Sequence, residues 1–346
     1  MHVLLSIIYK NTFRKNKVEN SLTKAFVLMK ENKQVFKVSG LMKVCLFINV
    51  SDISLKLFKD KKFKRKYKAI LYDSQQSRIT IAEYLERFNI SYIVLETSNI
   101  NHLYKDLANE IVSARKKGIT VYDAHEFYEH VNKRIPLVRL KTNEYLVDDI
   151  FTIGQKQEKL NLKRFIDVIV SIFLIPFVIP LILIGFLMVK LSSKGNVLFS
   201  QERVGKNSKT FTIHKIRTMV SKHNGDFTTK NDLRVNGVGK FLRTTKIDEL
   251  PQLWNILKGD MSLIGPRPER PQYVEISNEE NAMFDLRHLV KPGVTGWAQV
   301  NLPKATPKDN LEKLEYDLFY IKNYSVIFDI LIVFKTLKIV FTLNSN

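Results

Sequence analysis

An uncharged run of apolar residues from Val168 to Val189 constrains this chain more than any other feature of its sequence. In a helix, a run of this length rises about 33 Å, which is enough to cross the hydrocarbon core of a bilayer. Pro176 and Pro180 fall inside the run, and each removes a backbone hydrogen bond and favours a bend. The run therefore predicts a membrane-embedded segment, either a plain spanning helix or one broken near Pro180.

Basic residues flank this run on both sides. They are Lys159, Lys163 and Arg164 before it and Lys190, Lys194, Arg203 and Lys206 after it. Because the positive-inside rule places such residues in the cytoplasm, both flanks favour the same face of the membrane. We therefore expect a re-entrant segment within residues 165–190, with its helix break at Pro180. A spanning helix remains the alternative.

The charge of the chain restricts its partners. Lys and Arg outnumber Asp and Glu by 55 to 34, and the net charge of +21 predicts attraction to a polyanion. The long apolar run and the scattered basic residues favour an anionic membrane surface, and we expect no nucleic-acid partner. Cys45 is the single cysteine, which excludes an internal disulfide and fits a reducing compartment.

The first part of the chain predicts a small α/β domain. Residues 1–38 form a basic arm to which the sequence assigns no role. Beyond it, apolar runs typical of buried strands alternate with helical segments. The runs are 44–50, 69–72, 92–95 and 119–122, and the helical segments are 79–88 and 103–116. This alternation predicts a Rossmann-like parallel α/β domain over residues 39–131, followed by a linker at 132–158.

The loop after the first predicted strand argues against one familiar ligand. It reads Asn-Val-Ser-Asp-Ile-Ser and lacks the glycines that let a backbone approach a pyrophosphate. Dinucleotide binding by this domain is therefore not expected.

Two adjacent acids, Asp248 and Glu249, open a predicted helix over 250–257, with Pro251 in its first turn. An N-cap aspartate followed by an acidic first turn explains the pair without any function. On spacing alone, this explanation and a chemical role both stay open.

Several side chains near this pair suit a phosphorylated nucleotide. Guanidinium forks match phosphate oxygens, although any one of them can equally be a surface charge or a salt-bridge partner. The candidates are Arg203, Arg217, Arg243 and Arg267. Trp297 is a candidate to stack on a base and Gln299 to hydrogen-bond it, although a buried tryptophan is more often part of a core.

Three motifs follow one another in the second half of the chain. They are Gln-Glu-Arg-Val-Gly at 201–205, the stretch from Thr244 to Gly-Pro-Arg-Pro at 265–268, and Lys-Pro-Gly-Val-Thr-Gly-Trp-Ala-Gln-Val-Asn at 291–301. In this order they resemble the bacterial sugar transferases, the monotopic polyprenyl-phosphate phosphoglycosyl transferases that begin exopolysaccharide, capsule and O-antigen synthesis. The resemblance covers residues 160–341.

The resemblance implies a reaction. In this family the aspartate, here Asp248, attacks the sugar-proximal phosphorus of a UDP-sugar and releases UMP, and undecaprenyl phosphate then accepts the phosphosugar. Glu249 would hold Mg²⁺, Arg243 matches a phosphate-binding arginine, and Asp317 matches a recurrent acidic residue of open role. A carboxylate nucleophile can divide one difficult transfer into two easier steps, and a helix N-terminus favours its ionised form.

The resemblance also implies an architecture and a location. A mixed α/β catalytic domain over 159–346 would lie on the cytoplasmic face of the bacterial inner membrane, in contact with its lipids. The family breaks its re-entrant helix at a Ser-Pro pair, whereas Ile179 precedes Pro180 here. Tyr324 to Leu343 predicts either an amphipathic helix in the membrane interface, with its lysines toward lipid phosphates, or a core-packing helix.

Two further hypotheses remain. In the first, the chain is a membrane-tethered scaffold or regulator of polysaccharide assembly, in which the acidic pair only caps a helix. In the second, the net charge of +21 belongs to a nucleic-acid-binding protein. The oligomeric state stays open, with the α/β domain as a candidate surface for homo-oligomer formation. The sequence does not determine which sugar is transferred.

Overall fold

The computed structural model of this chain describes residues 42–72, 80–96, 105–137, 157–219 and 234–343. It divides into two compact units, Met1–Arg139 and Leu140–Asn346. The expected arm at 1–38 and most of the expected linker at 132–158 lie outside the described residues.

The first unit contains a parallel four-stranded sheet, so the predicted parallel α/β architecture is confirmed. Its strands are β1 (Lys43–Ile48), β2 (Tyr67–Tyr72), β3 (Ile90–Leu95) and β4 (Thr120–Asp123), in the order β2-β1-β3-β4. Each contains most of one predicted apolar run. Alternation along β1 fills both faces of the sheet, because Cys45 and Phe47 enter one core cluster while Leu46 and Ile48 enter the other.

Helices complete the two cores. Those described are α3 (Asp52–Lys59), α4 (Lys61–Lys66), α5 (Ile81–Arg87), α6 (Lys105–Lys116) and α7 (Ala124–Asn132). The helices α5 and α6 match the two predicted segments. The sequence did not predict the short helix α4, which is almost entirely basic. The carboxylate of Asp60 caps it by accepting from the N–H groups of Lys62 and Phe63.

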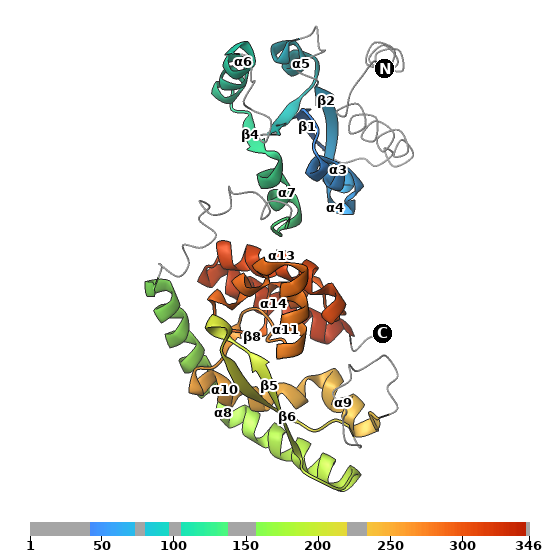
Figure 1. Cartoon of the computed structure of the whole chain (residues 1–346), viewed down its shortest axis with the longest axis vertical. Helices are drawn as coiled ribbons and strands as arrows, with labels where there is room; N and C mark the ends of the chain where they lie inside the picture. The colour runs from blue at the N-terminus through green and yellow to red at the C-terminus, as the bar shows by residue number, and fades with distance from the viewer. Residues whose placement is uncertain (1–41, 73–79, 97–104, 138–156, 220–233, 344–346) are drawn as a thin grey trace. The chain divides into compact units, whose positions relative to one another are not determined.

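The second unit begins with the long helix α8 (Gln157–Ser192), whose path bends in Figure 1. Among the described residues, Leu160–Ser192 is the one stretch long and apolar enough to cross a membrane by length and composition. Helical geometry continues through Pro176 and Pro180, in place of the predicted interruption at Pro180. A proline inside a helix removes one backbone hydrogen bond and crowds the preceding turn, so it favours a bend without ending the helix.

Both ends of α8 contact the same folded unit. Near its start, the carboxylate of Asp167 accepts from the backbone N–H of Leu263 at 3.1 Å. Near its end, Val189 is buried in a cluster with Ile216 and Leu242. Between these attachments the outward face is apolar and exposed. The two ends of the helix are therefore attached to the same unit, with the exposed apolar stretch between them.

A hairpin, a second strand pair and several short helices build the rest of this unit (Figure 1). The strands are β5 (Leu198–Val204), β6 (Thr210–Ile216), β7 (Ser262–Ile264) and β8 (Gly293–Thr295). The α-helices are α9 (Gly237–Thr245), α10 (Leu253–Lys258), α11 (Pro271–Glu280), α12 (Trp297–Asn301), α13 (Asn310–Lys322) and α14 (Val326–Leu343). The 3₁₀ helices are η6 (Lys206–Ser208), η7 (Ile247–Gln252), η8 (Ala282–Leu289) and η9 (Pro307–Asp309).

The glycines of the two later motifs serve close backbone packing. Strands β7 and β8 pair in parallel, and Gly265 continues from β7. A Cβ added to Gly293 would lie 2.1 Å from the backbone nitrogen of Gly265, and one added to Gly296 would lie 2.0 Å from its carbonyl oxygen. The two motifs are therefore one packed structure, formed where their backbones touch.

Helix α14 turns apolar side chains outward. Ile327, Phe334 and Phe341 are 80%, 66% and 73% exposed. In contrast, the ammonium of Lys335 lies 4.2 Å from the ring centroid of Trp297, which is buried. This orientation reverses the expectation that Lys335 faces lipid phosphates. An apolar outer face of this kind marks an interaction surface.

Candidate active site

The acidic pair lies in η7, immediately after α9. Lys246 joins the two helices in the left-handed conformation, with φ of 61°, and no side chain caps η7. Asp248 and Glu249 occupy the first turn of η7, and the α-helix α10 starts only at Leu253. The explanation of Asp248 as an N-cap is therefore wrong, because its carboxylate does not cap the helix that follows.

Glu249 is held by two cations at a single oxygen. Its Oε1 lies 2.7 Å from the Nζ of Lys215 on β6 and 2.7 Å from an Nη of Arg267 in the Gly-Pro-Arg-Pro segment. Burial alone would raise the pKa of Glu249, but Arg267 and Lys215 outweigh it and hold that pKa well below its usual range. Glu249 is thus a fixed negative charge.

Asp248 is buried beside this ion-paired group. Its side chain is 8% exposed, and within the described part of the chain its Oδ1 has no hydrogen-bond partner. Burial, followed by the charge of Glu249, raises the pKa of Asp248 to about 6, although Lys215, Lys246 and Arg243 oppose the rise. The expectation that a helix start favours its ionised form is therefore outweighed by burial. Asp248 is ionised at neutral pH but titrates just below it.

The carboxylate of Glu249 fits a hard cation. Both of its basic partners contact Oε1. The other oxygen, Oε2, is therefore the one available to a metal ion. Those residues contain no group of three or more His, Cys, Asp and Glu side chains that could hold a metal. Mg²⁺ does not require one, because it binds through one or two carboxylates together with substrate phosphates and water.

Two of the four candidate arginines lie at this site. Arg267 contacts Glu249 directly. Arg243 on α9 donates from Nε to the hydroxyl of Thr218 at 2.8 Å, and its charge lowers the pKa of Asp248. Both guanidinium groups therefore place positive charge near the acidic pair.

The other two arginines bind backbone carbonyls. Arg203 donates to the carbonyl of Pro268 at 2.9 Å. Arg217 donates to the carbonyls of Ser193 and Lys194 at 2.9 and 2.8 Å, and so closes the C-terminal end of α8. These contacts anchor backbone segments, and Arg203 also lies near enough for the charge of Glu249 to act on its pKa. Phosphate binding by Arg203 and Arg217 stays a prediction.

The remaining sequence candidates contact other parts of the same unit. Trp297 is 4% exposed and stacks on Phe319, with ring centroids 6.4 Å apart. Gln299 donates to the carbonyl of Val294 at 2.8 Å. Asp317 forms an ion pair with Arg287 at 2.7 Å. Trp297 and Asp317 are buried and Gln299 is half-buried, and in the described structure none of the three contacts the acidic pair.

Sequence reasoning missed Lys215. A signal was present, because alternation along β6 puts Lys215 on the same face as Phe211 and Ile213. A lysine in line with apolar neighbours on a half-buried strand indicates a buried ionic partner. Its acidic partner, Glu249, is 34 residues further along the chain and cannot be found from local pattern.

Comparison with known proteins adds to this geometry. The sequence pattern of the bacterial sugar transferase family matches residues 158–343. The chain is 40% identical, over 65% of its length and 53% of the relative's, to the UDP-N-acetylgalactosamine-undecaprenyl-phosphate N-acetylgalactosaminephosphotransferase of Aeromonas hydrophila. It is 44% identical, over 50% of its length and 39% of the relative's, to the UDP-glucose:undecaprenyl-phosphate glucose-1-phosphate transferase of Klebsiella pneumoniae.

The extent of these matches differs among relatives. The match spans 53% and 39% of the two named transferases, so about half or less of each. It spans 86% of a sugar transferase from Bacillus subtilis, at 39% identity over 51% of this chain. The family match at residues 158–343 lies within the second unit and contains Asp248 and Glu249.

Proposed function

The chain belongs to the bacterial sugar transferases, and from this membership we propose that it transfers a sugar 1-phosphate from a UDP-sugar to undecaprenyl phosphate. The names of its relatives, which include glucose and N-acetylgalactosamine phosphotransferases, support this substrate class. The reaction would begin the assembly of an exopolysaccharide, capsule or O-antigen.

One observation carries the proposal. Asp248 is a buried carboxylate whose Oδ1 has no hydrogen-bond partner within the described residues, beside a glutamate that two cations hold in place. Burying a carboxylate without partners is costly, so such a group is rarely kept for stability alone. We assign Asp248 as the nucleophile.

The proposed reaction has two displacements. An oxygen of Asp248 attacks the sugar-proximal phosphorus, while the bond from that phosphorus to the oxygen bridging the two phosphates breaks. UMP leaves with the bridging oxygen and its electron pair, and an aspartyl-phosphosugar remains. An oxygen of undecaprenyl phosphate then attacks the same phosphorus, frees the Asp248 carboxylate and forms the lipid-linked diphosphate sugar.

The surrounding residues neutralise the charge of the reacting groups. An anion that attacks an anion needs positive charge nearby, and preorganised cations supply it without reorganisation during the reaction. Arg243 and Lys246 lie where their charges act on Asp248, and Arg267 and Lys215 are fixed at Glu249. Mg²⁺ bound at Glu249 would supply further positive charge to the diphosphate and leaving group.

The fold also supports a location. Since both ends of α8 contact the same unit, a helix that crossed the bilayer would have to separate from its domain at one end. We propose that α8 enters the membrane and returns to the same face, with its apolar side in lipid. Its basic flanks favour the cytoplasmic face of the inner membrane, where nucleotide sugars are available.

The experiment that tests this function is UMP release by detergent-solubilised protein supplied with Mg²⁺, undecaprenyl phosphate and a panel of UDP-sugars. We expect release with at least one sugar, and its loss in Asp248→Asn while the variant stays folded. Lys209→Met is the control, because Lys209 is an exposed residue in the loop between β5 and β6. If the folded wild type releases no UMP with any sugar of the panel, the result would instead support the scaffold or regulator hypothesis.

A further inference from the structure

The Pro-Arg-Pro segment is held through its backbone carbonyls. Pro266 and Pro268 have no N–H, so their carbonyls are the backbone groups left to anchor them. Four successive carbonyls accept hydrogen bonds from other segments of the chain. They are those of Pro266, Arg267, Pro268 and Glu269, with Gly293, Arg287, Arg203 and Val204 as donors, each at 2.9 Å. The backbone around Arg267 is therefore fixed from outside.

One of these donors is itself fixed by a buried carboxylate. An Nη of Arg287 on η8 donates to the carbonyl of Arg267 at 2.9 Å and to Oδ2 of Asp317 on α13 at 2.7 Å. The side chains of Arg287 and Asp317 are each 1% exposed. A buried guanidinium needs a counterion to hold its position, so Asp317 determines where Arg287 lies.

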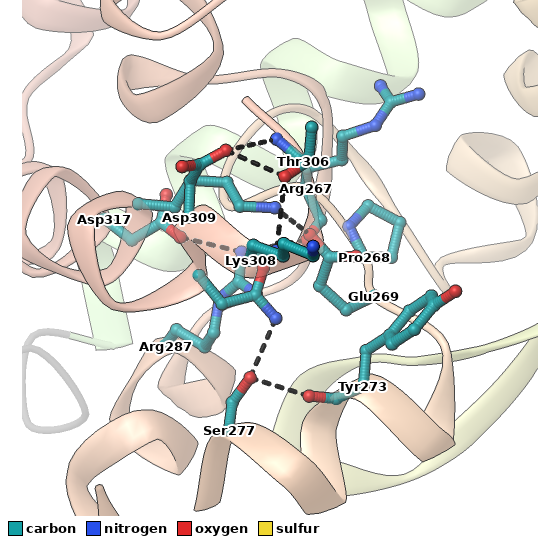
Figure 2. A network of polar contacts seen from close by, with 12 residues as sticks. Arg267, Pro268, Glu269, Tyr273, Ser277, Arg287, Thr306, Lys308, Asp309 and Asp317 are labelled. Carbon is teal, nitrogen blue, oxygen red and sulfur yellow. Dashed lines mark hydrogen bonds and ion pairs between the residues drawn. The ribbon is translucent and has the colours of Figure 1, made fainter. Parts of the chain in front are cut away.

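The other end of this chain of contacts is the active site. Figure 2 shows the guanidinium of Arg267 pointing away from the network that holds its backbone. That guanidinium contacts Oε1 of Glu249 at 2.7 Å. Asp317 is thus connected to Glu249 through two arginines, although it has no contact with Asp248 or Glu249 in the described structure.

We propose that Asp317 is a positioning residue for the transfer reaction. Its carboxylate fixes Arg287, Arg287 fixes the carbonyl of Arg267, and the guanidinium of Arg267 is thereby held at Glu249. This inference rests on the proposed function, and it assigns Asp317 an effect that it exerts without touching substrate. A residue of this kind matters because small displacements at a reacting centre lower rates strongly.

Asp317→Asn is the first test, since it removes the charge and keeps the shape. We expect faster backbone hydrogen exchange in residues 265–270, and a fall in kcat of about 10- to 100-fold. Asp309→Asn is the matched control, because Asp309 caps the turn before α13 by accepting from Thr306 at 2.7 Å and lies in the same region (Figure 2). It should leave kcat and the exchange of 265–270 unchanged.

A double-mutant cycle separates positioning from general damage. If Asp317 acts through Arg267, Asp317→Asn should lower kcat no further in a background that already carries Arg267→Met. If the fold decreases in kcat caused by the two single substitutions multiply in the double variant, the proposal would be overturned. Arg287→Lys is a second variant that keeps the buried charge opposite Asp317, and it should reproduce the effects of Asp317→Asn if that variant does not fold.

The exchange measurement also separates this inference from the proposed function. Absence of UMP release from the wild type would count against the function. Unchanged exchange of residues 265–270 in Asp317→Asn would count against the positioning role by itself.

Discussion

The Nζ atom of Lys215 lies 2.7 Å from Oε1 of Glu249, the same oxygen that Arg267 contacts. Two cations on one oxygen neutralise the buried carboxylate, and neither of them contacts its other oxygen, Oε2. The strand β6 thereby supplies a charge to η7 that nothing in the local sequence of η7 provides.

Lys215→Met should destabilise the protein by roughly 3 kcal/mol, because it breaks a largely buried ion pair. It should also lower UMP release, since Glu249 loses one of the two contacts that orient it. Urea unfolding and steady-state rates measure the two effects. Lys215→Arg should recover part of both. A Lys215→Met protein with wild-type stability would show that the contact contributes nothing to the fold.

The rate of UMP release should rise from about pH 5 to pH 7 with an apparent pKa of about 6, the value to which burial raises Asp248. The sign follows from the mechanism, because only the ionised carboxylate can attack phosphorus. Initial rates at saturating substrate across this range measure the midpoint. If the rate of UMP release does not depend on pH between 5 and 7, the protonation state of Asp248 does not control the rate-limiting step.

Asp248→Asn should stabilise the protein at neutral pH while it abolishes activity. The pKa of Asp248 rises from 3.8 to about 6 on folding, which corresponds to a cost of at most roughly 3 kcal/mol for keeping it ionised. That cost is fully present above the folded pKa and disappears below the unfolded one. Thermal unfolding should therefore show a higher Tm for the variant at pH 8, and a smaller difference at pH 4. Glu275→Gln, at an exposed position on α11, is a suitable control.

Both ends of α8 should be accessible from the cytoplasmic side only. In a background where Cys45 is replaced by Ser, Asn161→Cys and Leu191→Cys place single thiols at exposed positions of the helix. A membrane-impermeant thiol reagent should modify both in inverted membrane vesicles and neither in spheroplasts. Modification of one site from each side would establish a spanning helix.

Gly293→Ala should unfold or strongly destabilise the second unit, because the added Cβ would lie 2.1 Å from the backbone nitrogen of Gly265 and neither backbone can move aside. Gly237→Ala is the matched control, since its Cβ would meet nothing within 4 Å. The control should be neutral or stabilising by about 0.5–1 kcal/mol, because alanine loses less backbone entropy than glycine in a helix. Circular dichroism melts distinguish the two variants.

The sequence by itself determined the parallel α/β organisation of the first unit and the apolar helix of the second. Strand and helix periodicities are local, so the runs around Cys45 and Ile93 predicted their elements without knowledge of their neighbours. The order of motifs around Asp248 likewise identified the family. The short helix α4 was missed because its six residues are too few to show a helical period, and its support comes from the cap at Asp60 and from Phe63, which is buried in the core.

Only the tertiary structure decided which charged residues form the site. Arg203, Arg217, Arg243 and Arg267 are equivalent by chemistry, yet Arg267 contacts Glu249 and Arg243 acts on the charge of Asp248, whereas Arg203 and Arg217 hold backbone carbonyls. The same packing placed Lys215 at Glu249 and raised the pKa of Asp248. The physical reason is that ion pairing and burial depend on distances between residues far apart in the chain, which packing sets and local pattern does not encode.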